Sequence, residues 1–209
     1  MNPFEPVEEK VPFYKNIYLQ LFVLGAVMLT LLRPLLVREP PPPPVQGQLP
    51  VFALTNQKGE TFGSDQLKGK VYIASFLFTQ CTTVCPMLVK NLATLQKRFE
   101  DAHVDIPIVS FSVDPSTDTP AVLADYGTRA GANFDRWVFL TGPHDAMRKT
   151  LEGFALALEP KKVVNDLMDI AHSQRLVIVD GTGGLRGRYE SSGEGLDEVF
   201  HRAQHVLHE

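Results

Sequence analysis

Cys81 and Cys85 are the residues of this chain with the clearest capacity for chemistry, and they are its only cysteines. They lie in the sequence FTQCTTVCP, between an apolar run at residues 71–78 and a helical pattern that begins at Pro86. Two thiols at such a position can cycle between a dithiol and a disulfide, or they can bind a soft metal ion as thiolates. Both uses need the same residue types, so the pair alone leaves both interpretations open.

The position and spacing of the two cysteines refine this picture. Pro86 suits the first position of a helix, where its missing N–H has no cost. Cys85 then faces free backbone N–H groups and the positive end of the helix dipole, which predicts a lowered thiol pKa and a thiolate. Three residues separate the cysteines, one more than in a thioredoxin C-x-x-C pair. The wider loop leaves room for an ion, although a disulfide between Cys81 and Cys85 can still form. Two thiolates favour Cu(I), or zinc where further ligands exist.

His172 is the candidate for a third ligand. It ends an expected irregular stretch, residues 155–171, and precedes an apolar strand pattern at residues 176–179. A long loop that enters a late strand can fold over the cysteine turn of a thioredoxin-like sheet. Taken without that context, a single histidine is more often a residue with no role in metal binding.

Other polar groups have weaker claims. Asp114, in SVDPSTDTP, is either a carboxylate that supports the site or docks a partner, or an ordinary turn and helix-cap residue, and the turn is favoured. Three histidines share one face of the last expected helix, where a solvated surface is favoured over a secondary metal site; they are His201, His205 and His208. Met87 is expected to face the core or to flank the cysteine turn without binding metal.

The elements that must position these residues follow from periodicity. Apolar runs and turn signals predict a short hairpin and five further strands, at residues 50–54 with 60–62, then 71–78, 106–113, 137–140, 176–179 and 185–189. Helical patterns occur at residues 86–101, 120–131 (capped by Thr119), 145–154 and 195–207. This order predicts an α/β fold with a mixed central sheet flanked by helices, parallel in its first half and antiparallel in its second. A two-cysteine turn after the first core strand is typical of a thioredoxin-like fold.

The front of the chain predicts a membrane anchor. Residues 16–37 are apolar over about 20 positions, the length of a transmembrane helix; the stretch lacks the polar face of a core helix and is followed by no signal-peptide cleavage site. Residues 1–15 then form a cytoplasmic tail, residues 38–48 a stiff proline-rich linker, and residues 49–209 the folded domain. The positive charges flanking the span balance, so the orientation rests on the site: a cysteine site is more useful outside the cytosol. We expect a single-pass protein of a bacterial inner membrane, with contact to lipid through the helix and a periplasmic domain.

Overall charge excludes one class of partner. The formal net charge is −4 and the sequence pI is about 5.9, so no basic footprint for nucleic acid is present. A monomer is the default expectation.

Three segments together resemble the Sco/SenC family: FTQCTTVCP, the segment FSVDPSTDTP at residues 111–120, and AHSQRLVIVD at residues 171–180. The family consists of membrane-anchored, thioredoxin-fold copper chaperones that serve cytochrome c oxidase, and the likeness runs from about Leu49 to the C-terminus. The resemblance implies that Cys81, Cys85 and His172 bind one copper ion, as Cu(I) or Cu(II). It implies transfer to the copper-binding subunit of the oxidase, with an upstream copper donor or thiol reductant as a second partner. The chain has Ala171 and Thr82 where the family often has aspartate and proline.

The alternative is an enzyme. A periplasmic thiol–disulfide oxidoreductase that keeps a partner's copper-binding cysteines reduced would need Cys81 and Cys85 but not His172. A redox or copper sensor is a third, more distant interpretation.

Overall fold

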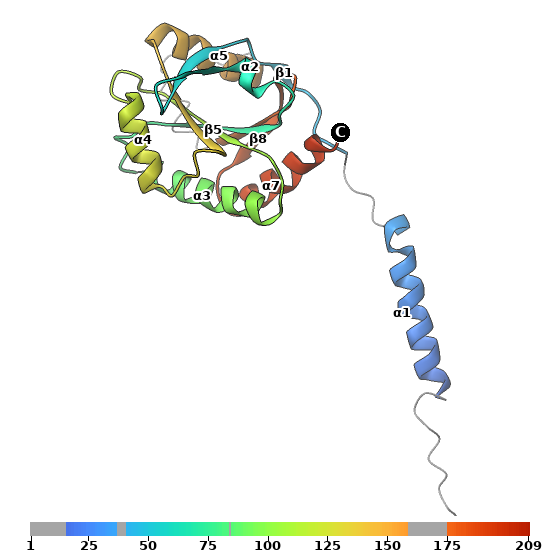
Figure 1. Cartoon of the computed structure of the whole chain (residues 1–209). Coiled ribbons are helices and arrows are strands. Elements are labelled where there is room, and N and C mark those ends of the chain that lie inside the picture. Colours follow the sequence, from blue (N-terminus) through green and yellow to red (C-terminus); the bar gives the residue numbers. More distant parts are fainter. Residues whose placement is uncertain (1–15, 37–40, 84, 159–174) are drawn as a thin grey trace, which may run out of the picture. The chain divides into compact units, whose positions relative to one another are not determined.

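The computed structural model describes residues 16–36, 41–83, 85–158 and 175–209, and the chain divides into two units at residues 41 and 42. The first unit contains helix α1 (Ile17–Leu36). The second unit comprises residues 42–209 and holds an eight-stranded sheet with helices on both faces (Figure 1).

Helix α1 confirms the helix predicted near residues 16–37. Its large apolar side chains are exposed from Ile17 to Leu32. Among the residues that the structure describes, no helix reaches the length and apolar character required to cross a membrane. The transmembrane anchor predicted over residues 16–37 is therefore not shown.

The centre of the sheet is parallel and one side of it is antiparallel. Strands β4 (Tyr72–Leu77), β5 (Ile108–Ser112) and β6 (Trp137–Thr141) pair in parallel. Strand β7 (Arg175–Val179) pairs with β4 in the antiparallel sense, and β8 (Gly184–Glu190) does the same with β7. The mixed sheet predicted from the order of the elements is confirmed.

The N-terminal hairpin completes the other side of the sheet. Strands β2 (Ala53–Asn56) and β3 (Thr61–Gly63) form the predicted hairpin, and β2 pairs with β6. Helix α2 (Ser64–Leu67) follows. The short strand β1 (Gly47–Gln48), which falls in the predicted linker, pairs with β8. The order across the sheet is β1-β8-β7-β4-β5-β6-β2-β3.

Four longer helices cover the faces of the sheet: α3 (Cys85–Asp101), α4 (Pro120–Arg129), α5 (His144–Leu158) and α7 (Glu194–Leu207). Thr119 caps α4 as predicted, because its side chain accepts a hydrogen bond from the N–H of Val122. Helix α5 is longer than predicted. The irregular stretch expected from residue 155 is helical over residues 155–158, and the rest of it lies outside the described residues.

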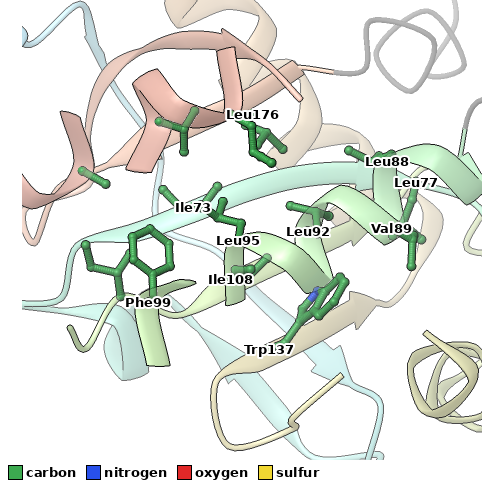
Figure 2. Packing of buried hydrophobic residues seen from close by; sticks show 14 of the residues in the cluster. Ile73, Leu77, Leu88, Val89, Leu92, Leu95, Phe99, Ile108, Trp137 and Leu176 are labelled. Atoms are coloured by element: carbon green, nitrogen blue, oxygen red, sulfur yellow. The ribbon is translucent and has the colours of Figure 1, made fainter. Parts of the chain in front are cut away.

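Two apolar clusters fix β4 from both faces. Ile73 and Leu77 belong to the cluster under α3 and α7 (Figure 2). Ala74 and Phe76 belong to the second cluster, which contains Leu151 and Phe154 of α5. This is the alternation that a strand produces when both of its faces are covered. Each fully buried leucine or phenylalanine contributes about 1.5–3 kcal/mol. The loop that follows β4 therefore starts from a rigid strand.

Several strand ends meet at one end of the sheet, which we call the cysteine end. Strands β4, β5 and β6 finish there because they are parallel neighbours. Strand β7 begins there, since its antiparallel register places Val177 beside Ala74 and leaves its first residue near the end of β4. Segments distant in the sequence thus converge on the loop that carries the cysteines.

Candidate metal centre

The two cysteines lie in and just after the loop between β4 and α3. The N–H of Cys81 donates to the carbonyl oxygen of Phe78 at 3.2 Å, which closes a turn directly after the strand. The N–H of Cys85 then donates to Sγ of Cys81 at 3.3 Å. Cys85 is the first residue of α3, one position before the predicted start at Pro86. The turn brings the sulfur of Cys81 to the first turn of the helix.

Both thiols are shielded from solvent, and neither is in a disulfide. Cys81 is 8% exposed and Cys85 is 0% exposed. A side-chain hydrogen bond joins the two cysteines. The chain thus holds two soft sulfur donors close together at the cysteine end of the sheet.

The thiol of Cys85 does not have the lowered pKa predicted from its place at a helix N-terminus. Its pKa is raised to about 12, chiefly because burial disfavours the thiolate. A backbone hydrogen bond with Phe78 lowers the pKa, but the hydrogen bond and charge of Cys81 and the charge of Asp118 raise it further. The prediction was wrong because it counted the helix dipole and could not count the burial.

Asp118 is the acidic residue that fixes the start of the cysteine loop, and the sequence analysis missed it. Its side chain is fully buried. One carboxylate oxygen accepts from the N–H of Thr79 at 3.1 Å and from Oγ1 of Thr79 at 2.6 Å. The other accepts from Oγ of Ser112 at 2.5 Å. Because Thr79 lies two residues before Cys81, this carboxylate anchors the start of the cysteine loop to the loop after β5.

Asp114, the carboxylate proposed from the sequence, forms the turn that was favoured for it. Its side chain accepts from Oγ of Ser116, and its carbonyl oxygen accepts from the N–H groups of Thr117 and Asp118. The carboxylate itself accepts hydrogen bonds, first from the side chain of Ser116 and then from Thr117, and these lower the pKa of Asp114 although partial burial raises it. A role beside the metal centre stays a prediction.

Tyr126 on α4 is a second residue that the sequence analysis missed. Burial raises the pKa of its phenol, and the charges of Cys85 and Cys81 raise it further. The ring packs edge-on against Phe139 with centroids 6.5 Å apart. The neutral phenol therefore belongs to the surroundings of the thiols. Neither the hydropathy of α4 nor its distance along the sequence from the cysteines predicts this electrostatic interaction.

The remaining candidates divide into two groups. His172, the predicted nitrogen ligand, lies outside the described residues. Within the described ranges, no group of three or more histidine, cysteine, aspartate or glutamate side chains is arranged to hold a metal ion. His201 and His208 are exposed, as the surface interpretation expects, whereas His205 is half-buried and its Nδ1 is shielded from solvent without a hydrogen-bond partner in the described ranges. Met87 is 55% exposed, so it flanks the cysteine loop and does not face the core.

Comparison with known proteins identifies the family of the second unit. The SCO1/SenC family model matches residues 43–207. The SCO1 protein homolog of Bacillus subtilis is 37% identical over 113 residues, which cover 54% of this chain and 57% of that relative. The match thus spans little more than half of the length of this curated relative.

Two solved structures resemble the fold. BsSco, described as a member of the Sco family of cytochrome c oxidase assembly proteins with a disulfide switch, is 30% identical with a TM-score of 0.67, over 78% of this chain and 95% of that one. Yeast Sco1 with copper bound is 21% identical with a TM-score of 0.59, over 76% of this chain and 93% of that one. These likenesses confirm the thioredoxin-like architecture that the order of the elements predicted.

Proposed function

Because the chain belongs to the SCO1/SenC family, we propose that it is a copper metallochaperone that serves the assembly of cytochrome c oxidase. The observation that carries the proposal is the pair of buried cysteines, Cys81 and Cys85, which lie together after β4 without a disulfide between them. Two adjacent sulfur donors suit copper, above all Cu(I), and suit hard cations poorly. Copper is the cargo, and it leaves by exchange of these ligands for those of the copper-binding subunit of the oxidase.

His172 supplies the third ligand in this proposal. It precedes the first residue of β7, Arg175, by three positions. Three residues span at most about 11 Å. Since β7 begins at the cysteine end of the sheet, the length of the chain allows the imidazole to approach the sulfurs. A nitrogen donor beside two sulfurs also permits Cu(II).

The redox state of the cysteines controls loading. Binding of copper replaces the thiol protons of Cys81 and Cys85. Oxidation of the two thiols to a disulfide gives up two electrons and two protons to an acceptor and removes both sulfur ligands. The disulfide switch described for BsSco supports this part of the proposal. An upstream thiol reductant or copper donor is the second expected partner.

Location is part of the same proposal. The exposed apolar side chains along α1, which include Phe22, Leu24 and Leu31, need a covering that water does not provide. We place α1 in a bacterial inner membrane, with residues 1–15 in the cytoplasm and the second unit in the periplasm. Alkaline extraction of membranes, combined with protease digestion of spheroplasts, tests this. Release of the full chain by alkali contradicts the anchor, and protection of the second unit in intact spheroplasts contradicts the orientation.

The copper site is tested on the full chain, purified in its reduced form. We expect one bound copper, with two sulfur ligands and one nitrogen ligand by X-ray absorption. His172→Ala should lower the copper affinity at least about tenfold, since losing one donor removes more than about 1.4 kcal/mol. His208→Ala, at an exposed position beyond α7, is the matched control. Unchanged affinity in His172→Ala refutes the three-ligand site, and copper retained by the double variant C81S/C85S refutes the chaperone.

A further inference from the structure

Two exposed apolar side chains mark the surface beside the cysteines. Beyond residue 51, Met87 and Val122 are the only large hydrophobic side chains exposed in the described part of the chain. Each is the third residue of its helix, in α3 and α4 respectively. Both helices begin at the cysteine end, where β4 and β5 finish. The two side chains therefore lie at the same end of the domain as Cys81 and Cys85.

A groove continues this apolar surface between the two helices. It has a volume of about 390 Å³, and its apolar wall consists of Pro86, Val89, Ala93, Tyr126 and Ala130. Pro86 follows Cys85 directly in the chain and Met87 follows Pro86, so the groove begins one residue after Cys85, although neither cysteine lines it. Val122 lies one helical turn before Tyr126. We call the groove together with Met87 and Val122 the docking groove.

The rim of the docking groove is positively charged, although the chain as a whole has a net charge of −4. Lys90 and Arg129 line it. Arg129 forms an exposed ion pair with Asp125 at 2.8 Å, whereas Lys90 makes no ion pair with any residue of the described ranges. A net positive rim around an apolar wall is complementary to carboxylates that flank an apolar side chain.

We propose that the docking groove receives an acidic protein segment, with an apolar anchor residue, of the partner that exchanges copper with Cys81 and Cys85. This inference rests on the proposed function and identifies the surface through which it operates. An apolar centre with charged surroundings is the usual composition of a protein interface, and methionine adapts well to different partners. The position of the groove brings such a partner's ligands next to the two thiols.

A second copy of this chain fits the groove less well. A symmetric dimer places the same patch of each subunit against its copy. Lys90 of one chain would then face the positive rim of the other, and like charges at an interface oppose association. An acidic partner satisfies the charge of the rim without this repulsion.

The test uses the full chain in its native cells. Strains carry Lys90→Glu or Met87→Glu in place of the wild type, and Lys58→Glu and Val45→Glu serve as matched controls. Lys58 is exposed in the turn between β2 and β3. Val45 is 53% exposed, close to the 55% of Met87, and lies beside the end of β8 remote from the cysteines. Copper stoichiometry and free thiol content of each purified variant are measured in parallel.

We expect all four variants to bind copper as the wild type does. In copper-limited cells, Lys90→Glu and Met87→Glu should lower oxidase activity about tenfold, and the two controls should leave it unchanged. Should Met87→Glu fail to fold, which a loss of its copper binding would reveal, Lys90→Glu decides alone. Wild-type oxidase activity in Lys90→Glu overturns the docking groove.

The experiment also distinguishes failure of the docking groove from failure of the proposed function. If sedimentation shows a wild-type dimer that Lys90→Glu dissociates, a second copy covers the groove and the inference is wrong. If the wild-type chain binds no copper, or if cells without it keep full oxidase activity, the proposed function itself fails. Failure of the docking groove alone leaves copper binding and wild-type delivery intact.

Discussion

Two buried aspartates at opposite ends of the sheet accept similar hydrogen bonds from a threonine, but within the described part of the chain only one of them is paired with a cation. At the cysteine end, Asp118 accepts from the N–H and Oγ1 of Thr79 with one oxygen and from Ser112 with the other. At the far end, in the turn between β7 and β8, one oxygen of Asp180 accepts from the N–H and Oγ1 of Thr182 and from the N–H of Gly184. Each threonine thus binds one carboxylate oxygen twice.

The difference between the two sites is the counter-charge. The second oxygen of Asp180 accepts from Nε of Arg186 at 2.6 Å, and this guanidinium also binds Glu209 at 2.7 Å. Burial alone would raise the pKa of Asp180, but the hydrogen bonds from Thr182 and Arg186 hold it below its usual value. No cationic side chain of the described ranges pairs with Asp118, which has only neutral donors. At the far end the carboxylate is paired with a cation, whereas at the cysteine end the charge of Asp118 acts on the thiol of Cys85 and raises its pKa.

The largest loss of unfolding free energy should come from a substitution at the far end that breaks the ion pair between Asp180 and Arg186. Asp180→Ala leaves the buried guanidinium of Arg186 with Glu209 as its remaining carboxylate partner, and it removes the acceptor of four hydrogen bonds. Breaking a buried pair from one side costs about 3 kcal/mol. Urea unfolding measures this, with Asp197→Ala, at an exposed pair with Arg98, as a control that should lose less than about 1 kcal/mol. Equal losses in both variants would remove the distinction between a buried ion pair and a surface pair.

Asp118→Asn should change both stability and thiol chemistry. Weakening hydrogen bonds to a buried carboxylate costs about 2 kcal/mol of unfolding free energy. Removing the negative charge also lowers the pKa of Cys85, because the charge of Asp118 is one of the causes that raise it. Alkylation of Cys85 by iodoacetamide at pH 9 should become several-fold faster. Asp180→Asn should leave that rate unchanged, and a similar acceleration in both variants would show that the effect is not local.

The raised pKa of Cys85 predicts an alkaline loss of stability in the reduced, copper-free protein. The thiol titrates near 9 when unfolded and near 12 when folded. Below pH 9 both states hold the proton, and between pH 9 and 12 only the folded state does. The stability from this group is therefore fully present below pH 9 and is lost as the pH rises toward 12, at a limit of about 1.4 kcal/mol per pH unit.

Urea unfolding at pH 8 and pH 11 checks this prediction. Cys85→Ala is the reference, because it retains the other alkaline groups, including Tyr126. The wild type should lose more unfolding free energy than Cys85→Ala over this interval. An identical loss would mean that the folded thiol ionises at its ordinary pKa.

The smallest loss of stability should follow from removing a single threonine hydroxyl at each end of the sheet. Thr79→Val and Thr182→Val each remove an Oγ1 hydrogen bond to an aspartate, of 2.6 and 2.7 Å respectively. Each should cost about 1 kcal/mol. Only Thr79→Val should alter the copper affinity of the reduced chain, because only Thr79 begins the loop that carries Cys81. A comparable change in Thr182→Val would break the assignment of separate roles to the two ends.

Much of the fold was predictable because local patterns fix it. The apolar run that forms β4, the helical pattern that forms α3 and the Thr119 cap each depend on neighbouring residues, and the structure confirms all three. The length of α5 was not predictable, since its last turn continues where the sequence indicated irregular structure. The cysteine pair was identified from residue type, spacing and its place between a strand and a helix, which left both the redox and the metal-binding interpretation open. The resemblance to the Sco/SenC family, carried by three motifs in order, was confirmed by the family match.

The sequence by itself determined where the strands, the helices and the two thiols occur, because these follow from periodicity, capping and residue type over short distances. Only the tertiary structure decided how the site behaves. Burial raises the pKa of Cys85, although its position at the N-terminus of a helix favours the thiolate. The parallel pairing of β4 and β5 brings Asp118, and not Asp114, onto the start of the cysteine loop. Desolvation and charge depend on which segments meet in space, and no local pattern carries that information.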